Sequence, residues 1–236
     1  MIDIRFISET ASTNDDVAAL ARAGAAEGVW LRAERQTAGR GRQGRAWRSP
    51  PGNLIASTLV RLRPGDPPAP TLALVAAVAL AETVEAFGVR PTIKWPNDLL
   101  VDGAKLSGIL LERVDDAVVI GFGVNLAHHP DDLDRPATSL AAVTGAAPDP
   151  DAFLVTLAEA FARWLGRWRG EGLGPVRARW MERAHSAGSA LTVHLPDGVL
   201  VEGLFEGLDE GGALRLRLAD GAVHVIHAGD VFLIRD

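Results

Sequence analysis

The stretch KWPNDLLVDGAKLSGILL, residues 94–111, predicts a β-hairpin, and the rest of the chain is interpreted outward from it. Two apolar runs, residues 99–101 and 106–111, are separated by an Asp-Gly pair. Such a pair between apolar runs is a strong hairpin signal, because both residues accept the positive φ angles of a tight turn. Pro96 cannot continue a regular strand, so we expect a separate short strand over residues 92–95.

On both sides of this hairpin, strand-like runs alternate with longer helical patterns. Residues 71–87 are apolar nearly throughout, which predicts a mostly buried helix. Large apolar side chains recur at helical spacing from Phe153 to Trp168, and this stripe indicates core packing rather than a cofactor site. These elements form a first domain, residues 1–186. It also contains predicted strands at 29–33, 54–62 and 117–126 and predicted helices at 16–26 and 175–184.

The pattern changes near residue 188, where short β runs separated by Gly-rich turns begin. Five such runs within about fifty residues predict a small antiparallel barrel. We therefore place a second domain at residues 187–236. Residues 186–236 carry eight acidic and three basic side chains, a net charge of −5, which argues against nucleic-acid binding by this domain.

Composition excludes several classes of protein. The chain has 236 residues, of which 47% are hydrophobic and 23% charged, so a sizeable core is expected. The absence of cysteine excludes disulfides, thiol nucleophiles and thiolate metal sites. A net charge of −6 argues against a generally basic, nucleic-acid-binding surface. The apolar stretch 69–81 is shorter than a membrane span, and the N-terminus lacks a secretory pattern, so we expect a soluble cytoplasmic protein.

Lysine, asparagine and glutamine are rare, and they gather in one part of the chain. Only two of the 24 basic residues are lysines, Lys94 and Lys105. The four asparagines, the two glutamines and both lysines all lie between residues 14 and 125. Lysine is a compact point charge and arginine a wide planar fork, so a retained lysine marks a position that arginine would not suit. Codon bias alone is the alternative explanation. We favour a polar active site within residues 12–125.

Residues 35–53 form a loop rich in glycine, arginine and proline. Gly39 to Gly44 formally match the GxGxxG pattern, but a dinucleotide-binding motif must open a helix, and the prolines that follow prevent this. Five arginines in this loop suit a carboxylate or a phosphate, and Trp47 suits a flat ring. A solvated basic loop and a loop that grips RNA are the alternatives.

Polar groups also surround the hairpin. Lys94, Asn97 and Asp98 place a cation, an amide and a carboxylate within five residues. Lys105 begins the second hairpin strand, and Asn125 places a polar amide in a buried strand, where it needs a hydrogen-bonding partner. Together with the Arg-Gly loop, these groups indicate a site for a small anionic ligand.

In combination, these motifs closely resemble the biotin protein ligase family. The resemblance rests on Ser12-Thr-Asn14, Gln36, Gly39-Arg-Gly-Arg-Gln-Gly-Arg-Ala-Trp47, Lys94-Trp-Pro-Asn-Asp98, Lys105-Leu-Ser-Gly108 and Gly-Phe-Gly-Val-Asn125, in that order. It covers essentially the whole chain. It implies an α+β fold: a class II synthetase-like catalytic domain with a mixed sheet and flanking helices, and a small C-terminal SH3-like β-barrel.

The resemblance also implies the roles of individual residues. The biotin pocket would be lined by Ser12, Thr13, Asn14, Gln36, Gly39, Arg40, Gly41, Arg42, Lys105 and Gly108. ATP would be bound by Arg42, Trp47, Lys94, Asn97, Asp98, Lys105 and Asn125. Lys105, Arg40 and Arg42 would be the catalytic residues, and Asp98 would hold Mg²⁺. Hydroxyl and amide groups suit a neutral ureido ring, and cations suit the biotin carboxylate and the α-phosphate.

The implied reaction is the ATP-dependent formation of biotinyl-5′-AMP and the transfer of biotin to a lysine of a biotin carboxyl carrier protein, that of acetyl-CoA carboxylase. Family members that repress transcription carry a DNA-binding domain before the Ser-Thr-Asn motif, whereas eleven residues precede Ser12 here. We therefore expect the ligase-only form, with no binding to DNA or membranes, as a monomer or homodimer. The alternatives are a lipoate or octanoyl ligase or transferase, an RNA-binding protein that uses the Arg-Gly loop, and a sensor without chemistry.

Overall fold

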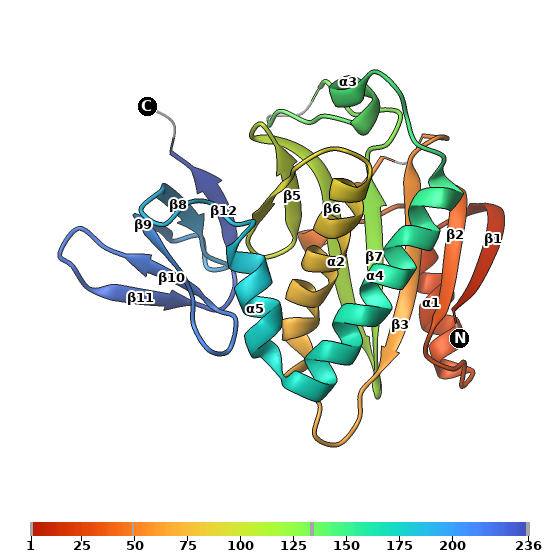
Figure 1. The fold of residues 1–236 in the computed structure, drawn as a ribbon, viewed down its shortest axis with the longest axis horizontal. Coiled ribbons are helices and arrows are strands. Elements are labelled where there is room, and N and C mark those ends of the chain that lie inside the picture. The colour runs from red at the N-terminus through yellow and green to blue at the C-terminus, as the bar shows by residue number, and fades with distance from the viewer. Residues whose placement is uncertain (1, 49, 133–134, 235–236) are drawn as a thin grey trace.

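The computed structural model describes residues 2–48, 50–132 and 135–234, which form two β-sheets flanked by helices (Figure 1). The larger sheet has seven strands in the order β1-β2-β3-β7-β6-β5-β4. Only β1 and β2 are parallel to each other, so the sheet is mixed, as predicted. Its strands are β1 (Asp3–Thr10), β2 (Val29–Gln36), β3 (Leu54–Arg61), β4 (Thr92–Lys94), β5 (Asp98–Val101), β6 (Ala104–Val114) and β7 (Ala117–Val124).

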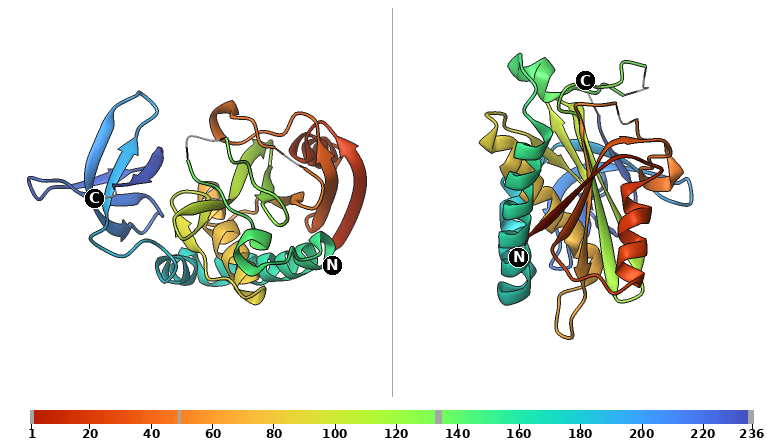
Figure 2. Two further views of the ribbon diagram at one scale, coloured as in Figure 1. Left: turned by 90° about the horizontal axis from the view of Figure 1, so that it is seen from above. Right: turned by 90° about the vertical axis from the view of Figure 1, so that its right-hand side faces the viewer.

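Helices cover the two faces of this sheet unequally (Figure 2). On one face lie α2 (Leu72–Ala86), α4 (Pro150–Glu171) and α5 (Leu173–Met181), and α1 (Thr13–Arg22) packs on the other. Helix α2 is long and apolar enough to cross a membrane by composition alone, but two thirds of this apolar stretch is buried inside the fold. Its apolar surface therefore forms the main core with the sheet and α4. The predicted stripe from Phe153 to Trp168 also faces this core.

The β-hairpin predicted within residues 94–111 is confirmed. Strands β5 and β6 pair in antiparallel fashion, and Asp102 and Gly103 between them have φ angles of 49° and 79°. Both values lie in the left-handed region that a two-residue hairpin turn requires. The turn brings Asp98 opposite Gly108 and places Lys105 on the same edge of the sheet. The local sequence thus assembles one corner of the candidate site.

The C-terminal residues form the second sheet, which is antiparallel throughout, in the order β11-β10-β9-β8-β12. Helix α5 contacts β9 and so connects this C-terminal domain to the first. Figure 1 shows the C-terminal domain beside the β4–β5 end of the large sheet. Its strands are β8 (Ala190–His194), β9 (Leu200–Leu208), β10 (Leu214–Arg217), β11 (Val223–Ile226) and β12 (Asp230–Leu233).

Several boundaries differ from the sequence-based expectations. Helix α1 was expected over residues 16–26 but begins at Thr13, because Ser12 itself is the N-cap and its hydroxyl accepts from the Asp15 amide. Strand β1 was not predicted, since it lies at the sheet edge and is exposed along most of its length. The short helix α3 (Leu140–Thr144), capped by Ser139, was also missed. Helix α5 begins and ends slightly earlier than the predicted 175–184.

Candidate functional site

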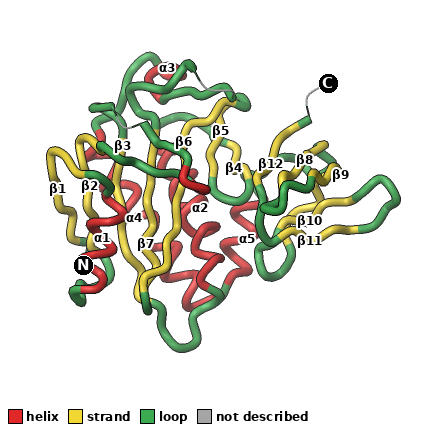
Figure 3. Tube along the Cα trace, turned by 180° about the vertical axis from the view of Figure 1, so that it is seen from behind, coloured by secondary structure: helices red, strands yellow, loops and turns green. Residues whose placement is uncertain are grey.

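A cavity of about 580 Å³ lies on the face of the large sheet opposite α2 and α4. The loop between β2 and β3 crosses this face, as Figure 3 shows from behind. All residues assigned above to biotin or ATP line the cavity except Gly39 and Lys94. Gly39 accepts a hydrogen bond from the Trp47 amide through its carbonyl, and Lys94 lies behind Asp98. The structure therefore brings together motifs that are up to 113 residues apart, from Ser12 to Asn125.

One end of the cavity, which we call the neutral end, is lined by Ser12, Thr13, Asn14 and Gln36, with Ser57 buried behind Thr13 and Asn14. The cap at Ser12 places Thr13 and Asn14 in the first turn of α1, where both side chains are buried. Parallel pairing of β1 with β2 brings Gln36 beside this turn. The Thr13 amide donates to Gln36 Oε1 at 2.8 Å.

A chain of hydrogen bonds continues from Thr13 through two residues that sequence analysis missed, Ser57 and Glu112. The hydroxyls of Thr13 and Ser57 are 2.7 Å apart, and Ser57 Oγ donates to Asn14 Oδ1 at 2.7 Å. Asn14 Nδ2 then donates to Glu112 Oε2 at 2.6 Å. The available sequence signal for Ser57 was a serine within the apolar strand-like run 54–62. These bonds fix both ends of the Asn14 amide before any ligand binds.

Three glycines make the floor of the cavity flat. A Cβ atom at Gly121 would lie 2.3 Å from Asn14 Oδ1, so only glycine leaves room for that amide. Gly108 and Gly123 are register partners on β6 and β7, and the Trp47 indole lies on this pair. A Cβ atom at Gly123 would approach the indole to 2.4 Å. Close approach of a ring to the backbone is therefore built into the sheet.

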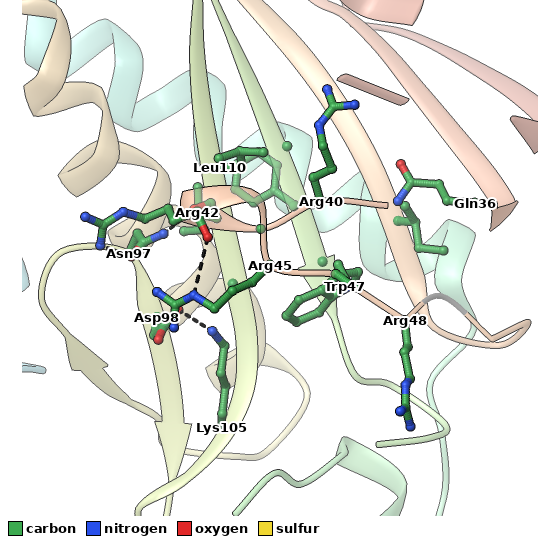
Figure 4. Close-up of a pocket in the computed structure, with 18 of the residues that line it drawn as sticks. Gln36, Arg40, Arg42, Arg45, Trp47, Arg48, Asn97, Asp98, Lys105 and Leu110 are labelled. Atoms are coloured by element: carbon green, nitrogen blue, oxygen red, sulfur yellow. Dashed lines mark hydrogen bonds and ion pairs between the residues drawn. The ribbon is translucent and has the colours of Figure 1, made fainter. Parts of the chain in front are cut away.

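The Arg-Gly loop is more ordered than the irregular loop predicted from its composition. It folds back on itself through an isolated bridge between Arg40 and Ala46, and a 3-10 turn at Arg42–Gly44 lies between them. The Gly41 amide donates to the Arg45 carbonyl at 2.7 Å. This turn sends the side chains of Arg40 and Arg42 toward opposite ends of the cavity (Figure 4).

Arg40 lines the cavity but lies apart from the other cations in this structure. Its guanidinium donates to both carboxylate oxygens of Asp15 on α1, at 2.9 and 2.6 Å, and lies 3.7 Å from Glu112. Hydrogen bonding from Arg40 lowers the pKa of the Asp15 carboxyl. These contacts tie the loop to α1 beside the neutral end, and the catalytic role of Arg40 stays a prediction. The ion pair of Arg40 with Asp15 could not be predicted from the loop sequence, because the loop itself contains no acidic residue.

The opposite end of the cavity, which we call the charged end, is lined by Arg42, Arg45, Asp98, Lys105 and Asp230, and it includes Lys94 behind Asp98. Asp98 lies between two ammonium groups, with Lys105 Nζ at 2.7 Å and Lys94 Nζ at 3.0 Å. Burial alone would raise the pKa of the Asp98 carboxyl, but Lys105 and Lys94 hold it below its usual value. Burial lowers the pKa of Lys94, and Asp98 opposes that effect. Asp98 is thus a buried anion that positions both lysines of the chain.

The two arginines of the charged end converge on Asp230, at the start of β12 in the C-terminal domain. Arg42 Nη1 lies 3.4 Å from Asp230 Oδ1 and donates to the Gly229 carbonyl at 3.2 Å. Arg45 Nη2 donates to Asp230 Oδ2 at 2.5 Å. Arg42 also donates to Asn97 Oδ1 at 3.4 Å. Neither Arg45 nor Asp230 was assigned a role from sequence, because nothing local links positions so far apart.

Four cations and two carboxylates leave the charged end with an excess of two positive charges. Such a site suits an anionic ligand with several oxygen atoms, such as a polyphosphate or a carboxylate. Asn125 lines the cavity, but its Nδ2 donates to the Thr138 carbonyl at 3.0 Å, so one side of its amide is already used by the fold.

The donor set does not fit a Mg²⁺ ion bound directly by Asp98. Each oxygen of this carboxylate already faces an ammonium group. Among the described residues, no three His, Asp or Glu side chains are grouped so that they could hold a metal ion. His129 pairs through Nδ1 with Ser139 Oγ at 3.1 Å. Mg²⁺ prefers several oxygen ligands, and this end of the cavity offers mainly cations.

Comparisons of the sequence with known proteins agree with this arrangement. A sequence model of the biotin/lipoate A/B protein ligase family matches residues 7–125, and one of the biotin protein ligase C terminal domain matches residues 188–234. The biotin--[acetyl-CoA-carboxylase] ligase of Paracoccus denitrificans is 40% identical, over 96% of this chain and 98% of its own length. The Mycobacterium tuberculosis protein of that name is 37% identical, over 97% of this chain and 88% of its own length.

Similarity extends to solved structures. The biotin protein ligase from Aquifex aeolicus in complex with biotin and ATP has a TM-score of 0.89 and 25% sequence identity, with 100% of both chains covered. The biotin protein ligase from Leishmania major in complex with biotinyl-5-AMP has a TM-score of 0.69 and 25% identity, over 96% of this chain and 99% of that one. Both domains of the present chain therefore have counterparts in these structures.

Proposed function

The chain belongs to the biotin protein ligase family, and from this premise we propose that it activates biotin with ATP and transfers it to a lysine of a biotin carboxyl carrier protein. The observation that carries the proposal is the polarity of a single cavity. Neutral hydrogen-bonding groups occupy one end and an excess of positive charge the other. Biotin has the matching polarity, with a neutral ureido ring and an anionic tail.

The ureido ring is assigned to the neutral end. Its carbonyl and two N–H groups need donors and acceptors, and hydroxyl and amide groups supply both. The chain of hydrogen bonds from Thr13 to Glu112 holds these groups in place in advance, which lowers the entropic cost of binding. Gly121 and Gly123 let the Asn14 amide and the Trp47 indole lie close to the backbone, where these two groups would flank the fused ring system.

The tail carboxylate and the α-phosphate of ATP are assigned to the charged end. In the first step a carboxylate oxygen attacks the α-phosphorus, the bond to the β-phosphate oxygen breaks, and pyrophosphate leaves. Two unit anions 4 Å apart repel by roughly 4 kcal/mol at an effective dielectric constant of 20. Lys105 and Arg42 offset this repulsion and stabilise the charge that develops on the phosphoryl oxygens. Trp47 lies beside Lys105, where its indole suits the adenine ring.

In the second step the ε-amine of a carrier lysine attacks the acyl carbon of biotinyl-5′-AMP. The acyl–oxygen bond breaks, AMP leaves with the electron pair, and the amine loses a proton as the amide forms. Acyl phosphates are already activated, so positioning of the amine contributes most. The loop that carries Trp47 and Arg42 covers the cavity and shields the mixed anhydride from water.

The structure does not support the predicted role of Asp98 as a direct ligand of Mg²⁺. When bound to the triphosphate, the ion supplies charge neutralisation. Because Asp98 is saturated by two lysines, we propose that the chain holds no Mg²⁺ through this carboxylate. Asp98 instead keeps the Lys105 ammonium facing the cavity.

The biological setting follows from the same assignment. The carrier that we propose is the biotin carboxyl carrier protein of acetyl-CoA carboxylase, the substrate named for the relatives from Paracoccus and Mycobacterium. We place the protein in the cytoplasm, as a monomer or a homodimer, with no DNA or membrane partner.

The alternatives predict different ligands. The dithiolane ring of lipoate has no ureido group, so it would make no hydrogen bonds with the hydroxyl and amide groups of the neutral end. An RNA-binding loop would keep its arginines free to contact phosphates, whereas Arg40 and Arg45 are paired with Asp15 and Asp230. Both observations favour biotin as the ligand.

ATP–pyrophosphate exchange tests the proposal directly. We expect exchange of labelled pyrophosphate into ATP that depends on added biotin, and no exchange with lipoate. Calorimetry with biotin and lipoate should show the same preference without nucleotide. Exchange that proceeds without biotin, or tighter binding of lipoate, would refute the assignment. A binding protein without chemistry would bind biotin and give no exchange.

A further inference from the structure

The start of β12 brings the C-terminal domain into contact with the charged end. Three consecutive residues take part: the Gly229 carbonyl accepts from Arg42, the Asp230 carboxylate pairs with Arg42 and Arg45, and the Val231 carbonyl accepts from Lys94 Nζ at 3.3 Å. The second domain therefore reaches three of the four cations of the charged end.

Asp230 is placed as a counter-ion and not as a surface acid. Its side chain is only 16% exposed, and each carboxylate oxygen faces a different arginine. Asp98 has the same arrangement toward the two lysines. The charged end is thus built from two carboxylates that each hold a pair of cations, one from the hairpin and one from the C-terminal domain.

This pairing matters because Arg42 and Arg45 belong to a glycine-rich turn. A free arginine side chain loses rotamer entropy when it is fixed in one geometry. A partner that fixes the guanidinium groups before the nucleotide arrives removes part of this cost from the binding step. The two arginines then lie side by side at the end of the cavity that contains Lys105 (Figure 4).

We propose that Asp230 is a positioning residue for nucleotide binding: it holds Arg42 and Arg45 where the phosphates of ATP bind, so that the C-terminal domain completes this part of the site. The proposal rests on the function proposed above. Asp230 does not touch the reacting atoms, since it acts through the two guanidinium groups. Biotin recognition at the neutral end does not depend on it.

Glu206 on β9 provides a matched control within the same domain. Its side chain is 17% exposed and also pairs with two arginines, Arg215 at 3.3 Å and Arg217 at 2.6 Å. These partners lie on β10 and do not line the cavity. Loss of Glu206 therefore reproduces the loss of a doubly paired, half-buried acid without a change at the charged end.

The experiment compares the KM values for ATP and for biotin in biotin-dependent exchange, using the full chain and the variants Asp230→Ala, Asp230→Asn and Glu206→Ala. For Asp230→Ala we expect the KM for ATP to rise about tenfold or more, as for the loss of a charged hydrogen-bonding partner, and the KM for biotin to stay within about twofold. Asp230→Asn keeps the shape with a single acceptor oxygen, so a smaller rise is expected, and this variant replaces Asp230→Ala if the latter fails to fold. Glu206→Ala should match the native protein.

A double variant shows whether Asp230 acts through the arginines. If it does, Asp230→Ala should raise the KM for ATP less in the Arg45→Ala background than in the native protein, because one of the two partners of Asp230 is already lost. An unchanged KM for ATP in Asp230→Ala, an equal rise in Glu206→Ala, or full additivity with Arg45→Ala would each overturn the proposal. Native protein without biotin-dependent exchange would instead refute the proposed function, so the two failures are distinct.

Discussion

The two ends of the cavity are built in different ways. The neutral end takes its groups from the first turn of α1, the end of β2 and the middle of β3, elements that lie side by side in the fold. The charged end takes its groups from the Arg-Gly loop, the β5–β6 hairpin and the C-terminal domain, with contacts that join Arg42 to Asp230. One end is set by regular secondary structure, and the other by tertiary contacts between loops and domains.

This difference determines how far each end of the cavity is ordered before a ligand binds. At the neutral end a buried chain of hydrogen bonds satisfies its own members, so its geometry is complete without a ligand. At the charged end two carboxylates hold four cations, and the remaining positive charge is balanced only when an anion binds. Changes at the neutral end should therefore alter biotin affinity, and changes at the charged end should alter chemistry and nucleotide binding.

The largest effect is expected for Lys105→Ala, which removes the ammonium group that faces both the cavity and Asp98. Adenylate formation should fall by about 10²–10³-fold, as for the loss of one preorganised transition-state donor. Single-turnover release of pyrophosphate measures this step. Biotin binding by calorimetry should change far less. Arg5→Ala, which removes an exposed cation on β1, is the control for net charge. Near-normal pyrophosphate release by Lys105→Ala would contradict the assignment of chemistry to the charged end.

The next largest effect is expected for Gly121→Ala, which tests the neutral end. The new Cβ atom would displace the Asn14 amide, since it would lie 2.3 Å from Oδ1. Loss of buried hydrogen bonds costs about 1–3 kcal/mol, so the dissociation constant for biotin should rise about 5- to 150-fold. Calorimetry with biotin and with ATP separates the two ends, and ATP binding should persist. Gly166→Ala on α4, where a Cβ atom meets no neighbour, is the control. Equal losses for both ligands would show that the ends are not independent.

The same contrast explains what the sequence could predict. Ser12, Thr13 and Asn14 form a helix cap, and the Asp-Gly turn sets the hairpin that carries Lys105, so local patterns place both within the fold. The resemblance of the motifs supplied the family. The helix cap and the hairpin turn depend on residues that are neighbours in the sequence, and the resemblance depends on the order of the motifs along the chain.

The remainder depends on distant partners that no local pattern reveals. The direction of Arg40 is decided by Asp15, and that of Arg45 by Asp230, 185 positions away. Strand β1 escaped prediction although Ile4 and Phe6 alternate with Asp3 and Arg5, since this alternation covers only the first half of the strand. Ser57 and Glu112 both contact Asn14, so their roles appear only once β3 and β6 lie on either side of β7.

A third prediction sharpens the comparison at the loop. Arg42→Gly removes contacts with Asn97, Gly229 and Asp230 and adds freedom to a turn that already contains glycines. Biotinyl-5′-AMP should dissociate about tenfold faster or more, because charged hydrogen bonds that hold the loop closed are lost. Stopped-flow measurement of adenylate release reports this rate. The matched control is Arg48→Gly on the same loop, since Arg48 pairs with Asp132 outside the charged end. If biotinyl-5′-AMP dissociated from Arg42→Gly at the native rate, Arg42 would not hold the loop closed over this intermediate.

The smallest expected effect concerns His185, a buried residue close to Lys94, and the pH dependence of stability. His185 follows α5 close to Lys94, and its Nε2 is buried with no hydrogen-bond partner among the described residues. Burial, aided by the Lys94 charge, lowers the pKa of His185 to about 4. An imidazole in the unfolded chain keeps a pKa near 6.5, so between pH 6.5 and 4 the unfolded state binds more protons.

His185 therefore contributes stability that is complete above about pH 6.5 and is lost progressively as the pH falls toward 4. Between pH 7 and 5 this loss amounts to about 2 kcal/mol in the free energy of unfolding. In His185→Leu the imidazole is absent, so the decline measured by urea unfolding at the two pH values should be smaller by about that amount. His224→Leu, which removes an exposed imidazole on β11, should follow the native protein. If the free energy of unfolding fell equally in the native protein and in His185→Leu, protonation of groups other than His185 would cause the loss of stability, and this prediction would be wrong.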